Sequence, residues 1–160
     1  MATPLRRCHL HAHSVRELVY TEGMVAVLSP KPDSAPRQKM FAALIMDRSS
    51  SMRRFRDFPL RAVNAYIQQL KQSTQASLLE VTVVIFDHAM DTLVPLCPVK
   101  ELKPLTTYTT GSGTRLHGTV ADVIDRLIER ADQEQRQGTE VTASVVVFTD
   151  GEDSSNPAGK

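Results

Sequence analysis

Three stretches of the sequence are apolar on both faces, and each of them is followed by an aspartate. Phe41–Met46 (FAALIM) precedes Asp47, and Ala143–Thr149 (ASVVVFT) precedes Asp150. The third stretch, Val81–Phe86 (VTVVIF), has the same character. A strand with two apolar faces has to be covered on both sides, which is typical of parallel sheets flanked by helices. These stretches therefore predict the central strands of an α/β fold.

The segments between these strands have the spacing of amphipathic helices. In the first, Asp57 is expected to cap the helix and Pro59 to lie in its first turn. Its apolar stripe is Leu60, Val63, Ile67 and Leu70. A second helix, ending near Gly138, has the stripe Leu116, Val120, Val123, Ile124, Leu127 and Ile128. With Asp91–Leu96 as an antiparallel edge strand, the order predicts an open, mostly parallel, Rossmann-like sheet with helices on both faces.

The first part of the chain has a different character. Ser29–Pro36 (SPKPDSAP) contains three prolines among polar residues and is expected to be a linker. Before it, two short apolar runs, ELVY and MVAVLS, flank Thr21–Gly23 and predict a small hairpin. We therefore divide the chain into an extension, residues 1–39, and a domain, residues 40–160.

Composition narrows the classes of partner. The 160 residues carry a formal net charge of +1 and no dense run of Lys or Arg, so neither nucleic acid nor a membrane surface is expected. The chain has no secretory signal and no apolar run of the ~18 to 20 residues that span a bilayer, so we expect a cytoplasmic protein. Cys8 and Cys97 are expected to be free thiols. His9, His11 and His13 alternate, but the sequence offers no fourth ligand for a transition metal.

Five oxygen-bearing side chains follow strands or precede the second helix. They are Asp47, Ser49, Ser51, Thr114 and Asp150. In open α/β sheets such groups gather at the carboxyl edge, and an extended loop would point the first three the same way. Oxygen ligands with two carboxylates favour a hard divalent cation, Mg²⁺ or Mn²⁺. The alternative is that these residues only cap helices, which for Thr114 alone is the stronger interpretation.

The same residues resemble a known family. Asp47-Arg48-Ser49-Ser50-Ser51-Met52 is similar to the DxSxS motif of von Willebrand factor A domains of the intracellular bacterial type. Phe86-Asp87, Gly113-Thr114 and Thr149-Asp150-Gly151 resemble three further motifs of that family, in the same order. The pattern around Leu93–Leu96 resembles bacterial domains near tellurium-resistance or stress-response systems.

The resemblance implies a metal-ion-dependent adhesion site. Ser49 and Ser51 would be direct ligands, Thr114 direct or water-bridged, and Asp47 and Asp150 mostly bound through water. A metal held by so few charges keeps positive character and an exchangeable position for a carboxylate from another protein. The expected function is therefore a non-catalytic interaction module with Mg²⁺ or Mn²⁺ as cofactor.

Two departures from the family pattern affect these expectations. Ser50 stands where the family usually has glycine, and would add strain of about 1 kcal/mol if the position needs an unusual backbone angle. The family sheet also continues beyond the last motif, so the sheet is expected to be truncated after its fourth core strand. Its exposed edge would then favour a homodimer, or be covered by the amino-terminal segment.

One enzymatic alternative has to be weighed against the interaction module. Asp47 could be the nucleophile of a Mg²⁺-dependent phosphoryl-transfer or phosphatase-like enzyme, with Asp150 helping to hold the metal. Such enzymes usually have a second carboxylate two residues after the nucleophile, where this chain has Ser49. We therefore expect no catalysis. Four arginines lie near the site in the sequence, and their expected function is to attract an acidic partner: Arg48, Arg53, Arg54 and Arg56.

Overall fold

The computed structural model describes residues 37–151. The chain divides by its internal contacts after Ala35, and the described residues all belong to the second unit, Pro36–Lys160. The predicted hairpin, the proline-rich linker, Cys8 and the three alternating histidines lie outside the described residues. The boundary drawn between residues 39 and 40 stays a prediction. Cys97 is a free thiol, as expected.

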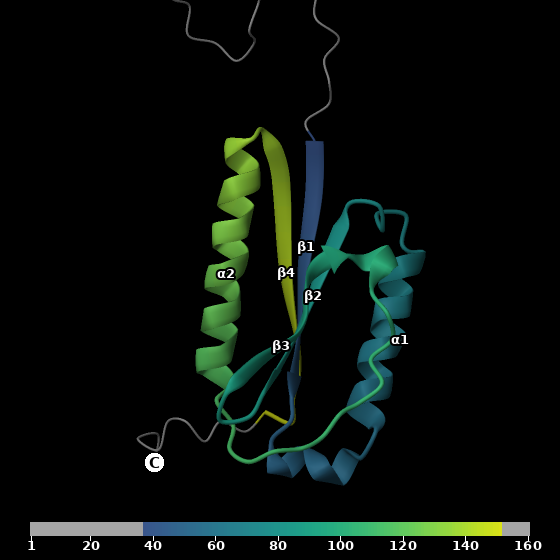
Figure 1. The fold of residues 1–160 in the computed structure, drawn as a ribbon, viewed down its shortest axis with the longest axis vertical. Coiled ribbons are helices and arrows are strands. Elements are labelled where there is room, and N and C mark those ends of the chain that lie inside the picture. The colour runs from purple at the N-terminus through teal and green to yellow at the C-terminus, as the bar shows by residue number, and fades with distance from the viewer. Residues whose placement is uncertain (1–36, 152–160) are drawn as a thin grey trace, which may run out of the picture. The chain divides into compact units, whose positions relative to one another are not determined.

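The described residues form a four-stranded mixed sheet with two long helices (Figure 1). The elements are β1 (Arg37–Asp47), η1 (Ser50–Phe55), α1 (Phe58–Gln72), β2 (Leu79–Phe86), β3 (Met90–Pro98), η2 (Val99–Glu101), α2 (Leu116–Arg136) and β4 (Thr139–Phe148). The strand order is β3-β2-β1-β4, with β1 parallel to both neighbours and β3 antiparallel to β2. The predicted α/β class, mostly parallel sheet and antiparallel edge strand are confirmed.

The central strands begin earlier than their apolar stretches suggested. β1 starts at Arg37, which pairs with Thr139 at the start of β4. The added residues are mostly polar, and those at the start of β1, Arg37 and Gln38, are exposed. Backbone pairing with a neighbouring strand needs no apolar side chain, so a hydrophobic pattern finds the buried part of a strand and misses its exposed extension.

The two faces of the sheet are covered by different helices, which lie on opposite sides of it in Figure 1. Alternate residues of β1, namely Ala42, Leu44 and Met46, belong to the same core as Val63 and Ile67 of α1. The residues between them, Phe41, Ala43 and Ile45, pack with Val123 and Leu127 of α2. Both faces of β1 are buried, which explains why its apolar residues do not alternate with polar ones.

Two helix predictions need correction. Asp57 occupies the N-cap position of α1 but makes no capping hydrogen bond; its carboxylate instead pairs with Arg61 at 3.2 Å. On α2, Ile124 and Ile128 are 40% and 53% exposed, although their spacing placed them in the core stripe. Arg126 reaches Thr92 of β3, so its side of α2 faces β3. Ile124 and Ile128 each lie two residues from Arg126, which places them on the flank of the helix that faces away from β3. No helix within residues 37–151 has the length and apolarity needed to cross a bilayer.

Candidate metal centre

The predicted site lies where β1 and β4 end side by side. Asp47 is the last residue of β1, and Thr149 and Asp150 follow β4 directly. The Thr149 hydroxyl donates a hydrogen bond of 2.8 Å to Asp47 Oδ2, and accepts one of 3.0 Å from the Gly151 amide. Parallel neighbouring strands bring their carboxyl ends to one edge, and this bond joins the two ends.

Asp47 is fully buried and holds the loop that follows it. Its Oδ1 accepts a 2.7 Å hydrogen bond from the Ser49 amide, so both carboxylate oxygens have a donor. Its backbone carbonyl accepts a hydrogen bond from the Tyr108 hydroxyl. Burial, followed by the negative charges of Asp47 and Asp150, raises the pKa of Tyr108 to about 12, so this hydroxyl remains protonated and able to donate. Asp47 therefore connects Ser49, Thr149 and Tyr108 through hydrogen bonds in the protein interior.

The two serines meet in a different way from the one predicted. Ser51 lies within the 3₁₀ helix η1, so the loop after β1 is not extended as we expected. The turn nevertheless brings Ser49 Oγ and Ser51 Oγ to 3.0 Å from each other. Ser50 does not have a positive φ; within residues 37–151 the one non-glycine residue that does is Arg56, at 52°. The strain considered for Ser50 is therefore absent, because a serine fits this backbone without cost.

The loop before α2 is fixed to the ends of both β1 and β2. The Gly111 amide donates to the Arg48 carbonyl at 2.6 Å, and the Arg115 amide donates to the Asp87 carbonyl at 2.7 Å. A Cβ on Gly111 would lie 2.1 Å from Asp87 Oδ2, so only glycine fits there. Thr114, between these two anchors, is buried. α2 begins at Leu116 with Arg115 at its N-cap position, and a capping role for Thr114 stays a prediction.

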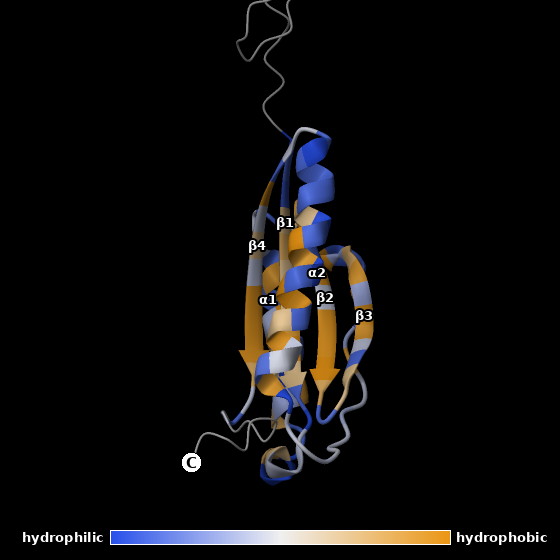
Figure 2. Cartoon of the chain, turned by 90° about the vertical axis from the view of Figure 1, so that its left-hand side faces the viewer, coloured by the Kyte–Doolittle hydropathy of each residue, from blue (hydrophilic) through white to orange (hydrophobic). Residues whose placement is uncertain are grey.

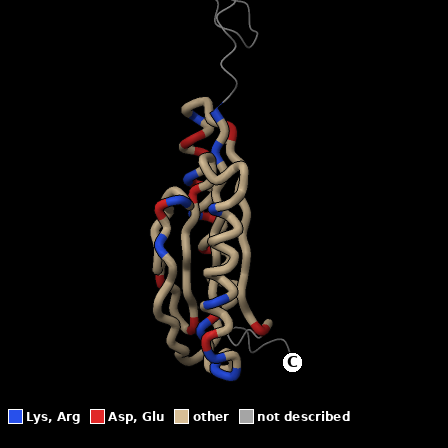
Figure 3. The backbone as a smooth tube through the Cα atoms, turned by 90° about the vertical axis from the view of Figure 1, so that its right-hand side faces the viewer, with Lys and Arg blue, Asp and Glu red and all other residues tan. Residues whose placement is uncertain are grey.

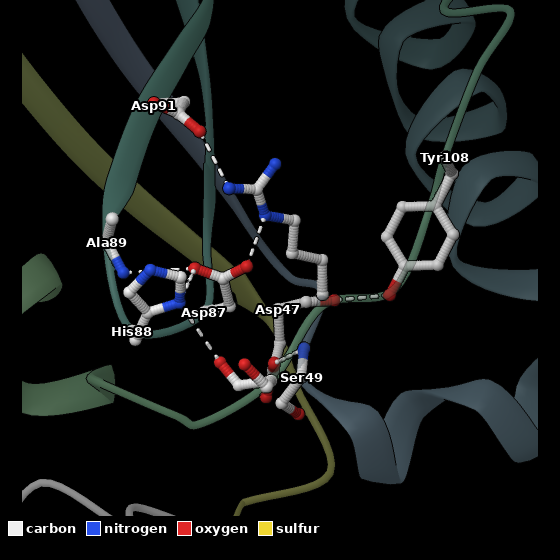
Figure 4. A network of polar contacts seen from close by, with 9 residues as sticks. Asp47, Ser49, Asp87, His88, Ala89, Asp91 and Tyr108 are labelled. Atoms are coloured by element: carbon white, nitrogen blue, oxygen red, sulfur yellow. Dashed lines mark hydrogen bonds and ion pairs between the residues drawn. The ribbon is translucent and has the colours of Figure 1, made fainter.

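Asp87 is buried and forms a polar network with its neighbours beside the site (Figure 4). Its Oδ1 accepts from the Ala89 amide at 3.0 Å, as a loop-capping residue would, but its Oδ2 also lies 3.0 Å from Arg48 Nε. Arg48 pairs in addition with Asp91 at 2.7 Å. Burial raises the pKa of Asp87, but the Ala89 amide and the charges of Arg48 and His88 outweigh it and hold this pKa below its usual value. Sequence reasoning missed this network, although Asp87, like Asp47, directly follows a buried strand.

Asp150 differs from Asp47 in its hydrogen bonding. Its side chain is only 2% exposed, its Oδ2 lies 3.2 Å from Arg54 Nη2, and its buried Oδ1 has no hydrogen-bond partner within residues 37–151. A buried carboxylate oxygen without a donor is costly unless a cation or a water binds it. Together with the serine hydroxyls, it gives an all-oxygen donor set that fits a hard divalent cation.

The structure thus links four of the five predicted residues and fixes the loop that carries the fifth, Thr114. Direct bonds join Asp47 to the Ser49–Ser51 pair, Thr149 joins Asp47 to the segment of Asp150, and the neighbours of Thr114 are bound to Arg48 and Asp87. Within the described range, no three His, Cys, Asp or Glu side chains are grouped to hold a metal. A metal here would depend on the serine and threonine hydroxyls, which is the chemistry of Mg²⁺ rather than of zinc.

Positive charge borders this edge of the sheet. Figure 3 shows Lys and Arg gathered at the lower end of the molecule, where η1 lies. Arg53, Arg54 and Arg56 are exposed there. Arg48, which the sequence placed in the same cluster, is drawn inward by Asp87 and Asp91. The exposed part of the cluster is therefore limited to η1 and the residue that follows it.

Comparison with known proteins gives a likeness of fold. No protein-family model matches the chain, and none of the curated proteins matches it significantly. Among solved structures, the ArnB paralog VWA2 from Sulfolobus acidocaldarius has a TM-score of 0.52 and 17% sequence identity, over 76% of this chain and 30% of that one. The structure of three N-terminal domains of the type V pili tip protein Mfa5 from Porphyromonas gingivalis has a TM-score of 0.52 and 14% sequence identity, over 72% of this chain and 20% of that one.

These likenesses are distant and partial. The chain spans less than a third of the length of either matched chain. Neither structure bears on tellurium resistance, so that narrower resemblance stays a prediction. The shared part is the open α/β sheet with its two helices, and the described residues therefore have a von Willebrand factor A-like fold.

Proposed function

We propose that this domain is a non-catalytic protein-interaction module that captures a partner carboxylate through Mg²⁺ or Mn²⁺. The observation that carries the proposal is the buried Asp150 carboxylate, whose Oδ1 has no donor within the described residues, at the same sheet edge as the Ser49–Ser51 pair. A von Willebrand factor A-like fold supports an interaction role, and the residues that hold the metal in the resembled family are all present. The proposed partner is a protein that supplies an Asp or Glu side chain.

The contacts suggest different roles for the five residues. Ser49 and Ser51 have adjacent hydroxyls and would bind the metal directly, with Thr114 as the third hydroxyl. Asp47 already accepts two hydrogen bonds, so it would fix the Ser49 loop and act on the metal through water. Asp150 would supply charge at the site. When bound, the metal supplies an electrophilic position that accepts a carboxylate oxygen from the partner.

Magnesium-dependent stabilisation tests the proposal. A ligand at 100 times its Kd stabilises a folded protein by about 2.7 kcal/mol. In a chain of this size, that stabilisation raises the Tm by about 5 to 11 °C. We expect such a rise in Tm for the wild type and for the control Ser50→Ala, and none for Ser51→Ala. Ser50 is exposed and adjacent in sequence, so the two variants differ mainly in access to the site. A Tm that is independent of Mg²⁺ in the wild type would overturn the proposal.

The geometry favours this interaction role over the phosphatase-like alternative. Asp47 is fully buried and both of its carboxylate oxygens accept hydrogen bonds, which lowers the reactivity of a nucleophile. The residue two positions later is Ser49, whose hydroxyl faces Ser51. Release of phosphate from an aryl phosphate by the wild type, abolished in Asp47→Asn, would instead favour the enzyme.

A further inference from the structure

We propose that Arg54 competes with the metal for Asp150, so that metal binding releases this arginine toward the partner. The inference rests on the proposed metal site and concerns its regulation. Arg54 lies near the end of η1, the 3₁₀ helix that contains Ser51, and reaches across to the segment after β4. One short helix thus provides both a proposed metal ligand and a competing cation.

The ion pair joins a buried carboxylate to an exposed guanidinium. Asp150 Oδ2 lies 3.2 Å from Arg54 Nη2, and the two side chains are 2% and 63% exposed. A carboxylate buried to this extent requires a positive charge or several donors nearby. In the part of the chain that the structure describes, Arg54 is the positive side chain in contact with Asp150, so it supplies that charge.

The contact is also of a kind that a divalent cation can replace. Only one guanidinium nitrogen pairs with one carboxylate oxygen, whereas the strong Arg–carboxylate geometry uses two parallel hydrogen bonds. Most of the guanidinium is in solvent, where water and salt weaken an ion pair. Its carbon also lies 4.8 Å from the centre of the Phe55 ring, which stabilises the arginine at the rim of the site.

Competition has two consequences for binding. A metal at Asp150 has to displace Arg54 or to tolerate a positive charge beside it, so Arg54 lowers the affinity for the metal. Once displaced, Arg54 joins Arg53 as free positive charge at the rim, where it can attract the acidic partner. Because coupling between two binding events is reciprocal, an acidic partner that binds Arg54 should strengthen metal binding.

Calorimetric titration with Mg²⁺ alone measures the competition. We expect Arg54→Gln to lower the Kd by about threefold or more, which corresponds to loss of a surface ion pair. Arg53→Gln is the matched control, since Arg53 is exposed, carries the same charge and has no ion pair within residues 37–151. Any general effect of removing one charge is common to both variants. An equal Kd in the two variants, or a higher Kd in Arg54→Gln, would overturn the inference.

A second measurement, made without metal, separates this inference from the proposed function. In the presence of a chelator, Arg54→Gln should have a lower Tm than Arg53→Gln, because Asp150 has lost its counter-charge. An unchanged Tm would show that the pair does not form, which overturns the competition even if Mg²⁺ binds. If the chelator result is as expected but no variant binds Mg²⁺, the metal site itself is wrong, and the competition fails with it.

Discussion

Asp87 helps to hold the candidate site together without being one of its proposed ligands. It is buried at the end of β2, it pairs with Arg48 next to Asp47, and Gly111 of the loop before α2 lies against its carboxylate. Three segments that are distant in sequence are thereby fixed to one side chain. Loss of the negative charge would leave Arg48 partly buried with only the exposed Asp91 as partner.

Asp87→Asn should therefore lower stability in a pH-dependent way. The pKa of Asp87 in the folded protein is below its ordinary value of 3.8, so the unfolded chain binds this proton more readily. The stabilisation is fully present above the unfolded pKa and is lost as pH falls through the lower folded pKa. We expect the free energy of unfolding of the variant to be about 1 to 3 kcal/mol lower than that of the wild type at pH 7. Below about pH 4, in the acid limb of the profile, the stability of the variant should fall less steeply with pH than that of the wild type.

Urea unfolding between about pH 2 and pH 7 measures this difference, given the ordinary range of carboxylate pKa values. Asp91→Asn is the matched control, because Asp91 pairs with the same arginine but is 57% exposed. It should follow the wild-type profile closely. Parallel acid limbs for wild type and Asp87→Asn would show that the pKa of Asp87 is not lowered by folding.

Sequence reasoning singled out Asp47, Ser49, Ser51 and Asp150 because they obey one local rule, that polar residues follow buried strands. Asp87 obeys the same rule, but its network could not be predicted because its partners Arg48 and Gly111 come from other parts of the chain. The sequence could not predict either that both carboxylate oxygens of Asp47 accept hydrogen bonds from donors in the chain, whereas only one oxygen of Asp150 does. These hydrogen bonds depend on Thr149 and Arg54, whose side-chain directions are set by the folded strands.

At the scale of elements, the segment between η2 and α2 has a defined course without regular structure. Both polar atoms of the Asn64 side chain bind the backbone of Leu105, at 2.8 and 2.9 Å, and Tyr108 binds the carbonyl of Asp47. Lys71 binds the carbonyl of Leu102. The hydrophobic pattern predicted the strands and helices, but this segment is held by bonds from side chains to backbone, which leave no periodic signal.

Asn64→Ala should release this segment and weaken the proposed metal site. Two hydrogen bonds are lost, so the free energy of unfolding should fall by about 1 to 3 kcal/mol. Because the segment leads to Thr114, the Mg²⁺ Kd should rise as well. The control is Gln68→Ala, one turn further along α1 and exposed. Urea unfolding and calorimetry check the two effects, and a destabilised variant with an unchanged Kd would argue against Thr114 as a ligand.

At the scale of the whole sheet, its two edges differ. β3 carries Asp91 and two prolines, Pro95 and Pro98, which discourage pairing with another strand. β4 pairs only with β1 among the described strands, and Glu140 is its one charged residue. Figure 2 shows β4 at the side of the sheet, with hydrophobic colour over its last part. The exposed Ile124 and Ile128 lie on the flank of α2 away from β3.

Such an edge favours pairing between two copies of the chain, and we expect an antiparallel β4–β4 contact with twofold symmetry. Sedimentation should show a mass that rises with concentration from 17.7 kDa toward twice that value. Thr142→Lys places a charge on an exposed position of β4 and should keep the protein monomeric, because lysine on an edge strand opposes pairing. Ser77→Lys adds the same charge at an exposed turn far from β4 in sequence and should leave the dimer intact. A wild type that remains monomeric, or a Thr142→Lys variant that still dimerises, would exclude this edge as the contact.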